Sequence, residues 1–215
     1  MATLSELAEV IAKVEGVDHA TVTWIGRSLR EARLVAKHGR GPSAAQMGWS
    51  DATNMLIAVN ATRNTAEAAR AVFAYRRFRP EQYEVPISEM NRDFTLGEAI
   101  EQLLVAAGTS RPPTPFLGTT DDYELSEAFE TGQVHVELRF RTSAPSALLR
   151  IAVPIGEAKP ELTAQAPTLL VVHFSPRKVR DPPKARQDRS GDRLEETTIG
   201  FRTLREVGRL IRSHS

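Results

Sequence analysis

The sequence predicts an α+β fold, in which an N-terminal helical part precedes a small α+β domain with an antiparallel sheet. Apolar residues recur at helical spacing in most segments up to about residue 107, whereas from residue 134 they alternate with polar residues. Between these parts lies the segment 111–115, RPPTP, and such a cluster of prolines interrupts regular structure. We therefore expect two domains, 1–110 and 111–215, the second serving oligomerisation or partner binding.

The N-terminal residues predict two consecutive helices. The first, at about 4–15, begins with a capping box in which Thr3 is the N-cap and Glu6 is the N3 residue. The second, at 19–33, follows Asp18, which is a favourable N-cap residue. Its apolar residues form one stripe for burial: Val22, Ile25, Leu29 and Ala32.

A basic, glycine-containing stretch follows the second helix. Short β-capable segments at 34–37 and 43–47 flank Gly39 and Gly41, which predicts a β-hairpin. The tip of this hairpin carries three basic side chains: Lys37, His38 and Arg40.

The segments LSELAEVI, DHATVTWIGRSLREARLV and KHGRG, taken in this order, resemble the winged helix-turn-helix domain of MarR-type transcription regulators. The resemblance covers the N-terminal part only. It implies that the second helix enters the major groove of DNA and that the hairpin is a wing reaching the flanking backbone. Arg33 departs from the pattern, because such sequences often have glycine there. The helix that usually precedes the motif is missing, so helices after the wing would complete the core.

The expected DNA-binding residues lie on the second helix and the wing. Small polar side chains at the helix start let the backbone approach base edges, and Arg27 can reach guanine or phosphate. Arg30 and the wing cations are better placed for phosphates. Trp24 either packs on a sugar or a thymine methyl group, or lies against the domain's own core. The set is His19, Thr21, Thr23, Trp24, Arg27, Ser28, Arg30, Lys37, His38 and Arg40.

These features favour a non-catalytic, sequence-specific double-stranded DNA-binding protein, most simply a transcriptional regulator. Because one winged helix covers one half-site, a homodimer is the simplest assembly. One alternative is a DNA-recognition subunit of a phage packaging machine, similar to a small terminase, which would form rings. Another is a protein-interaction module whose helix-turn-helix is structural only.

Later segments predict further helices and four strands. The residues expected on the first strand alternate between apolar and polar, as in a half-buried strand. The helices are expected at about 51–60, 65–79, 95–107 and 202–213, and the strands at about 134–141, 147–155, 168–174 and 196–200.

Charge is distributed unevenly along the chain, although the formal net charge is only +1. Residues 1–80 carry 11 Lys/Arg and 7 Asp/Glu, residues 81–130 carry 2 and 11, and residues 131–215 carry 15 and 9. The basic segment 177–193 is expected to be a solvated loop, and the acidic patch 121–130 a solvated helix. This basic, acidic, basic layout matters more than the total charge, because local fields steer partners.

Several classes of site find no support in the sequence. The chain has no cysteine, which excludes thiolate metal sites and cysteine nucleophiles. It has no phosphate loop, dinucleotide fingerprint or nucleophile elbow, so we expect neither an enzyme nor a cofactor. His135, Glu137 and His173 are the one set that could bind a metal, and exposed sheet residues are the simpler interpretation.

No segment approaches the ~20 apolar residues of a membrane span. The N-terminus, MATLSELAEV, lacks the basic and apolar regions of a signal peptide. We therefore expect a cytoplasmic protein with no membrane partner.

Overall fold

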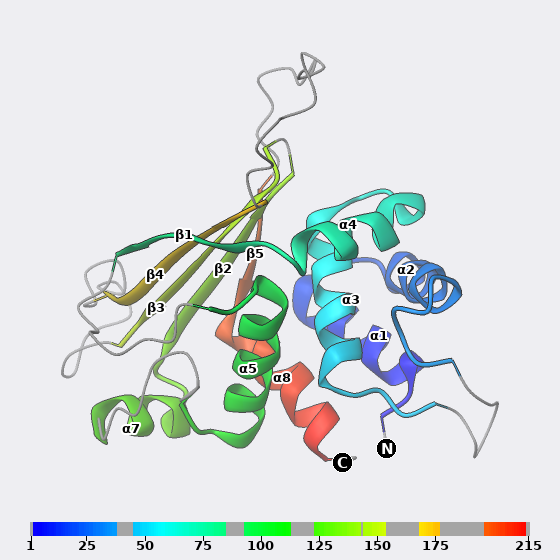
Figure 1. Ribbon diagram of the computed structural model, residues 1–215. Coiled ribbons are helices and arrows are strands. Elements are labelled where there is room, and N and C mark those ends of the chain that lie inside the picture. Colours follow the sequence, from blue (N-terminus) through cyan, green and yellow to red (C-terminus); the bar gives the residue numbers. More distant parts are fainter. Residues whose placement is uncertain are drawn as a thin grey trace, which may run out of the picture.

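The computed structural model describes residues 2–37, 45–84, 93–112, 123–142, 144–153, 168–176 and 196–213. Over these ranges the fold is α+β, as expected, with helices first and a five-stranded antiparallel sheet later (Figure 1). The α-helices are α1 (Leu4–Glu15), α2 (His19–Glu31), α3 (Trp49–Ala61), α4 (Ala68–Tyr75), α5 (Leu96–Thr109), α7 (Tyr123–Thr131) and α8 (Phe201–Arg212), and a short 3-10 helix, η2 (Thr65–Glu67), precedes α4. The strands are β1 (Arg79–Glu84), β2 (His135–Arg141), β3 (Ser146–Ala152), β4 (Thr168–Ser175) and β5 (Glu196–Gly200).

The expected helices, and the four strands expected after residue 130, form within a few residues of their predicted bounds. Their end signals act as the sequence indicates: the capping boxes at Thr3 and Thr95 are both complete. Strand β1 was not predicted, because its sequence, RPEQYE, is mostly polar and follows a helical pattern. It pairs with β4 at one edge of the sheet.

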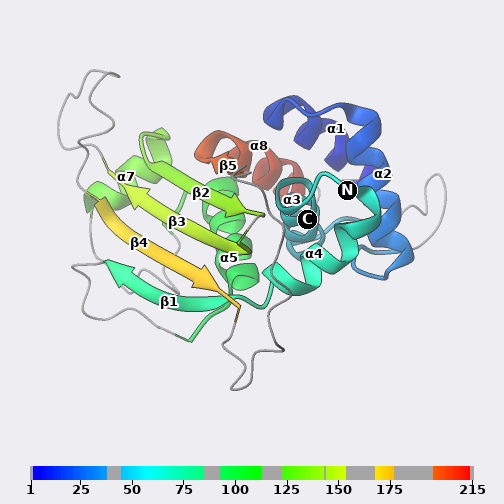
Figure 2. The same cartoon turned by 90° about the horizontal axis from the view of Figure 1, so that it is seen from above.

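The sheet has the strand order β1-β4-β3-β2-β5, and every pairing is antiparallel. Leu138 in the middle of β2 pairs with Leu149 on β3 and Ile199 on β5, and all three side chains are buried. Helices α5 and α8 lie on one side of the sheet in both views (Figures 1 and 2). One face of the sheet therefore joins the helices in a common core.

Contacts cross the expected domain boundary at residues 110 and 111. Strand β1 comes from before this boundary, and α8 from the end of the chain packs against α5 and α1. The Thr197 hydroxyl on β5 donates to the Asn60 carbonyl on α3 across 2.7 Å. Buried side chains from Ala2 to Ile211 form one continuous hydrophobic cluster.

Within the described ranges, every helix is too short or too polar to span a membrane.

Candidate nucleic-acid interface

A tight turn joins α1 to α2. Gly16 ends α1 in the left-handed conformation, with φ of 66°, where a side chain is unfavourable. Asp18 then caps α2: its carboxylate accepts hydrogen bonds from the Thr21 backbone N–H (2.9 Å) and hydroxyl (3.1 Å). The backbone bond from Thr21, with the bond from its hydroxyl, lowers the pKa of Asp18, because both bonds stabilise the charged carboxylate. This capping fixes where α2 starts.

Helix α2 has one buried face and one outward face. Val22, Ile25 and Leu29 are buried in the core, where α2 packs against α1 and α3. Two residues at the helix start, His19 and Ala20, are exposed, and so are Trp24 and Arg27 further along the helix. The core contacts thus orient α2 so that Trp24 and Arg27 face outward.

Trp24 and Arg27 form the main feature of the outward face. The indole is 59% exposed, and the guanidinium carbon of Arg27 lies 4.9 Å from its ring centroid. The alternative in which Trp24 lies against the domain's own core is therefore wrong. An arginine over an indole is a favourable cation–π pair, and it leaves both groups accessible to a partner.

The remaining residues expected to bind DNA on α2 are less accessible. The Thr21 hydroxyl is engaged in the cap. The Thr23 hydroxyl oxygen and Arg30 Nε are buried and have no hydrogen-bond partner in the described part of the chain. Ser28 is half-buried. Of the residues expected to bind DNA on α2, the exposed ones are therefore His19, Trp24 and Arg27.

The end of α2 carries an unusual backbone conformation. Arg33 has φ of 59°, in the left-handed region that favours glycine. The Leu34 N–H returns to the Leu29 carbonyl across 2.9 Å, which closes the helix end. Glycine would adopt this conformation without strain. Arginine here costs about 1–2 kcal/mol in backbone strain.

The prediction of a strand on either side of the wing tip is wrong. Residues 34–37 and 45–47 form no strand, and residues 43 and 44 lie outside the described ranges. Their backbone groups bind elsewhere. Asp51 on α3 accepts from the Ala36 N–H (3.0 Å), and the Asn54 amide donates to the Leu34 carbonyl (2.6 Å). The Met47 N–H donates to the Ala2 carbonyl (2.8 Å). Helix α3 and the N-terminus thus take the hydrogen bonds that a hairpin would need.

The cations expected at the wing tip are described only in part. Lys37 is exposed. His38 and Arg40 lie outside the described residues, so their contribution to this surface stays a prediction.

Beyond the end of α2 lies an open groove of about 820 Å³. It is formed by the segment after α2, the first turns of α3 and α5, and the last turns of α4. The side chains around it include four cations: Arg33, Lys37, Arg76 and Arg77. The sequence did not predict this groove, because its walls come from four separate segments.

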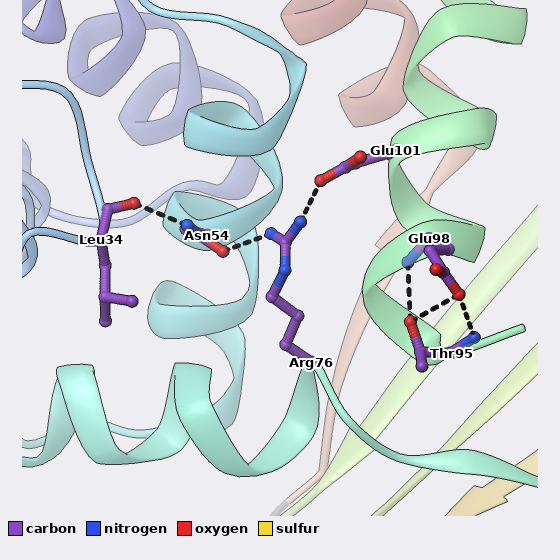
Figure 3. A network of polar contacts seen from close by, with 6 residues as sticks. All are labelled: Leu34, Asn54, Arg76, Thr95, Glu98 and Glu101. Carbon is purple, nitrogen blue, oxygen red and sulfur yellow. Dashed lines mark hydrogen bonds and ion pairs between the residues drawn. The ribbon is translucent and has the colours of Figure 1, made fainter.

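A polar network includes three of the residues that line the groove: Leu34, Asn54 and Arg76 (Figure 3). Arg76, at the end of α4, donates to the Asn54 side-chain oxygen across 2.6 Å and forms an ion pair with Glu101 on α5. The side-chain NH2 of Asn54 donates a hydrogen bond to the Leu34 carbonyl. The network therefore connects the segment after α2 to α3, α4 and α5 and fixes the shape of the groove.

The possible metal ligands of the sheet are not brought together. His173 pairs with Leu148, which in turn pairs with Arg139, four residues along β2 from His135. With strands about 4.8 Å apart and about 3.4 Å per residue, the two histidines are roughly 17 Å apart. Nitrogen ligands of one zinc ion lie within about 4 Å of each other. Among the described residues no group of metal ligands is found.

Comparisons with protein-family models, curated proteins and solved structures find no match to this chain.

Proposed function

We propose that this protein binds double-stranded DNA through the outward face of α2 and acts, most simply, as a transcriptional regulator. The observation that carries the proposal is the exposed Trp24–Arg27 pair. It lies on a helix that follows α1 after a short turn and whose opposite face is fixed in the core. A helix held in this way can enter a major groove with its outward residues against the bases.

The chemistry of the outward face suits DNA. A guanidinium can donate to the two acceptors of guanine, or to a phosphate. The Trp24 ring offers an apolar surface for a sugar or a thymine methyl group. Lys37 adds a positive charge beyond the end of the helix, where the phosphate backbone would continue. The net charge of residues 1–80 favours the same partner.

A single reading helix covers one half-site, so the regulator is proposed to act as a homodimer. The mass in solution tests this part. A dimer supports the regulator, whereas a ring of many copies supports the packaging-machine subunit.

The DNA-binding proposal is tested by selecting bound sequences from random duplexes and then titrating the selected site. Arg27→Ala should weaken specific binding by about 1–3 kcal/mol, because a base or phosphate contact is lost. Since Arg27 is exposed, the circular dichroism spectrum should stay native. Arg202→Ala, an exposed change on α8, is the matched control and should leave binding unchanged.

Two results would count against the proposal. Equal binding by Arg27→Ala and the parent would remove α2 as the reading helix. Absence of binding at both low and high salt would favour a protein-interaction module, since phosphate contacts strengthen at low salt.

A further inference from the structure

A second exposed aromatic side chain, Phe73, forms a cation–π pair with an arginine, as Trp24 does. Phe73 on α4 is 49% exposed, and the guanidinium carbon of Arg77 lies 5.9 Å from its ring centroid. Among the described residues the exposed large hydrophobic side chains are Trp24, Phe73 and Val105. Both exposed aromatics are therefore paired with arginine, but Phe73 lies at the groove beyond α2.

The cations of this groove are more available than its carboxylates. Asp51 accepts from the backbone N–H groups of Ala36 and Gly48, and Glu98 accepts from the N–H of Thr95 (2.6 Å; Figure 3). Within the described part of the chain, the groove cations without an ion pair are Arg33, Lys37 and Arg77. The groove lining therefore carries four cations against two carboxylates and presents a net positive charge to an entering molecule.

Apolar side chains lie between these cations. Val35 and Val72 are buried beneath the groove, Leu34 and Ala36 are half-buried, and the Phe73 ring is open to solvent. A ligand that suits such a site combines a flat apolar part with an anionic group. The volume of about 820 Å³ lies in the range of small-molecule sites.

We propose that this groove binds a nucleotide, with its base against Phe73 and its phosphate at Arg33, Lys37 and Arg77. Bases stack on aromatic rings irrespective of their sequence, and guanidinium groups match phosphate oxygens. The nucleotide is either a free mononucleotide or one unit of a single strand, since both present a base and a phosphate.

The conformation of Arg33 supports this assignment. A strained backbone persists where the surrounding structure fixes it, and such positions cluster at binding sites. Glycine would fit the turn without strain, yet the chain has arginine, whose side chain lines the groove. A requirement for its positive charge gives a reason for this choice.

This inference does not depend on duplex binding by α2. Both sites include Lys37, but Trp24 and Arg27 belong to the duplex site alone, and Phe73 and Arg33 belong to the nucleotide site alone. Each site can therefore fail its own test while the other passes.

The test measures fluorescence anisotropy of a labelled oligothymidylate of about 12 nucleotides, which is within the range of single-strand sites. Unlabelled adenosine monophosphate, inorganic phosphate and a duplex are the competitors. Phe73→Ala and Arg33→Gly are the variants, and Arg70→Ala is the control, because Arg70 is exposed on the same helix but does not line the groove. Circular dichroism checks that every variant folds.

We expect the single strand or the mononucleotide to bind, and each variant to weaken that binding about tenfold while the control leaves it unchanged. Displacement of the strand by the mononucleotide assigns the site to both sources, and strand binding without displacement assigns it to single strands. The proposal is overturned if neither ligand binds at millimolar concentration, or if both variants bind as the parent does. It is equally overturned if phosphate competes as well as the mononucleotide, because the base would then contribute nothing.

Discussion

Gly108 on α5 and Gly208 on α8 lie in direct backbone contact. A Cβ added to Gly108 would lie 2.7 Å from the carbonyl carbon of Gly208, and one added to Gly208 would lie 2.9 Å from the Gly108 nitrogen. It would also lie 2.5 Å from the carbonyl oxygen of Leu104. All these distances are shorter than an ordinary van der Waals contact, so the two helices cross where neither has a side chain.

Gly208→Ala should therefore destabilise the protein. Alanine favours a helix over glycine by about 1 kcal/mol, but backbone atoms on α5 cannot move as a side chain can. We expect a net loss of about 1–3 kcal/mol in the free energy of unfolding, measured by urea denaturation. Arg202→Ala on the exposed face of α8 is the control and should change stability by less than about 0.5 kcal/mol. A Gly208→Ala protein as stable as the control would show that the helices separate easily.

Most of the fold could be predicted because its signals are local. The Thr95–Glu98 capping box needs only four consecutive residues, and the alternation on β2 needs only its own sequence. Strand β1 lacked such a signal: it is an edge strand whose pairing with β4 joins residues about ninety positions apart. Nothing in the sequence RPEQYE itself indicates that partner.

In the candidate site, too, features with a local sequence signal could be predicted, and features that depend on distant residues could not. Trp24 and Arg27 were identified from helical spacing, and the structure places them on one exposed face. The prediction of wing strands failed because side chains on α3 bind the backbone groups that a hairpin would use. Asp51 binds the N–H of Ala36, 15 positions away, and Asn54 binds the carbonyl of Leu34, 20 positions away. The groove at Phe73 could not be predicted, since the tertiary fold alone brings its four segments together.

Arg33→Gly should stabilise the protein. The residue has φ of 59°, where an L side chain crowds the following carbonyl oxygen and glycine does not. We expect a gain of about 1 kcal/mol in the free energy of unfolding. Arg33→Ala removes the same charge but keeps a Cβ, so it should give no comparable gain. Equal effects of the two changes would mean that charge, and not backbone strain, determines stability at this position.

Glu15→Gln should change how stability depends on pH. Burial raises the pKa of Glu15 above its ordinary value of 4.5, and hydrogen bonds with Thr203 and Asn60 oppose this shift only in part. The folded state therefore binds the proton more tightly than the unfolded chain does. The stabilisation of the folded state by this proton is fully present below pH 4.5. It is lost as the pH rises through the raised pKa of Glu15.

The measurement is the melting temperature of the parent and of Glu15→Gln at a series of pH values from about 4.5 to neutral. The glutamine stays neutral, so the variant should gain stability relative to the parent as the pH rises toward neutral. Glu9→Gln on the exposed face of α1 is the control and should follow the parent. Parallel curves for Glu15→Gln and the parent would exclude this carboxyl as the source of the dependence.

The last prediction concerns the cations after α2. If Lys37 and Arg40 contact DNA phosphates, the double change Lys37→Ala, Arg40→Ala should weaken all duplex sequences about equally, because phosphate contacts carry no base information. It should also lower the slope of log K against log salt by roughly two for each protomer bound, since each phosphate neutralised contributes ~0.9. His38→Ala is the matched control from the same segment. Histidine is mostly neutral at pH 7, so this change should leave the slope unaltered.

The segment after α2 is either a DNA contact surface or a solvated loop. The two interpretations predict different slopes of log K against log salt, so they can be separated even if affinity changes for another reason. A solvated loop that is basic without touching DNA predicts the same slope before and after the double change. A contact surface predicts a lower slope whether or not the backbone forms a hairpin, because counterion release depends on charge and proximity alone. Titrations of one duplex at several salt concentrations therefore test the contact independently of the wing strands that 34–37 and 45–47 do not form.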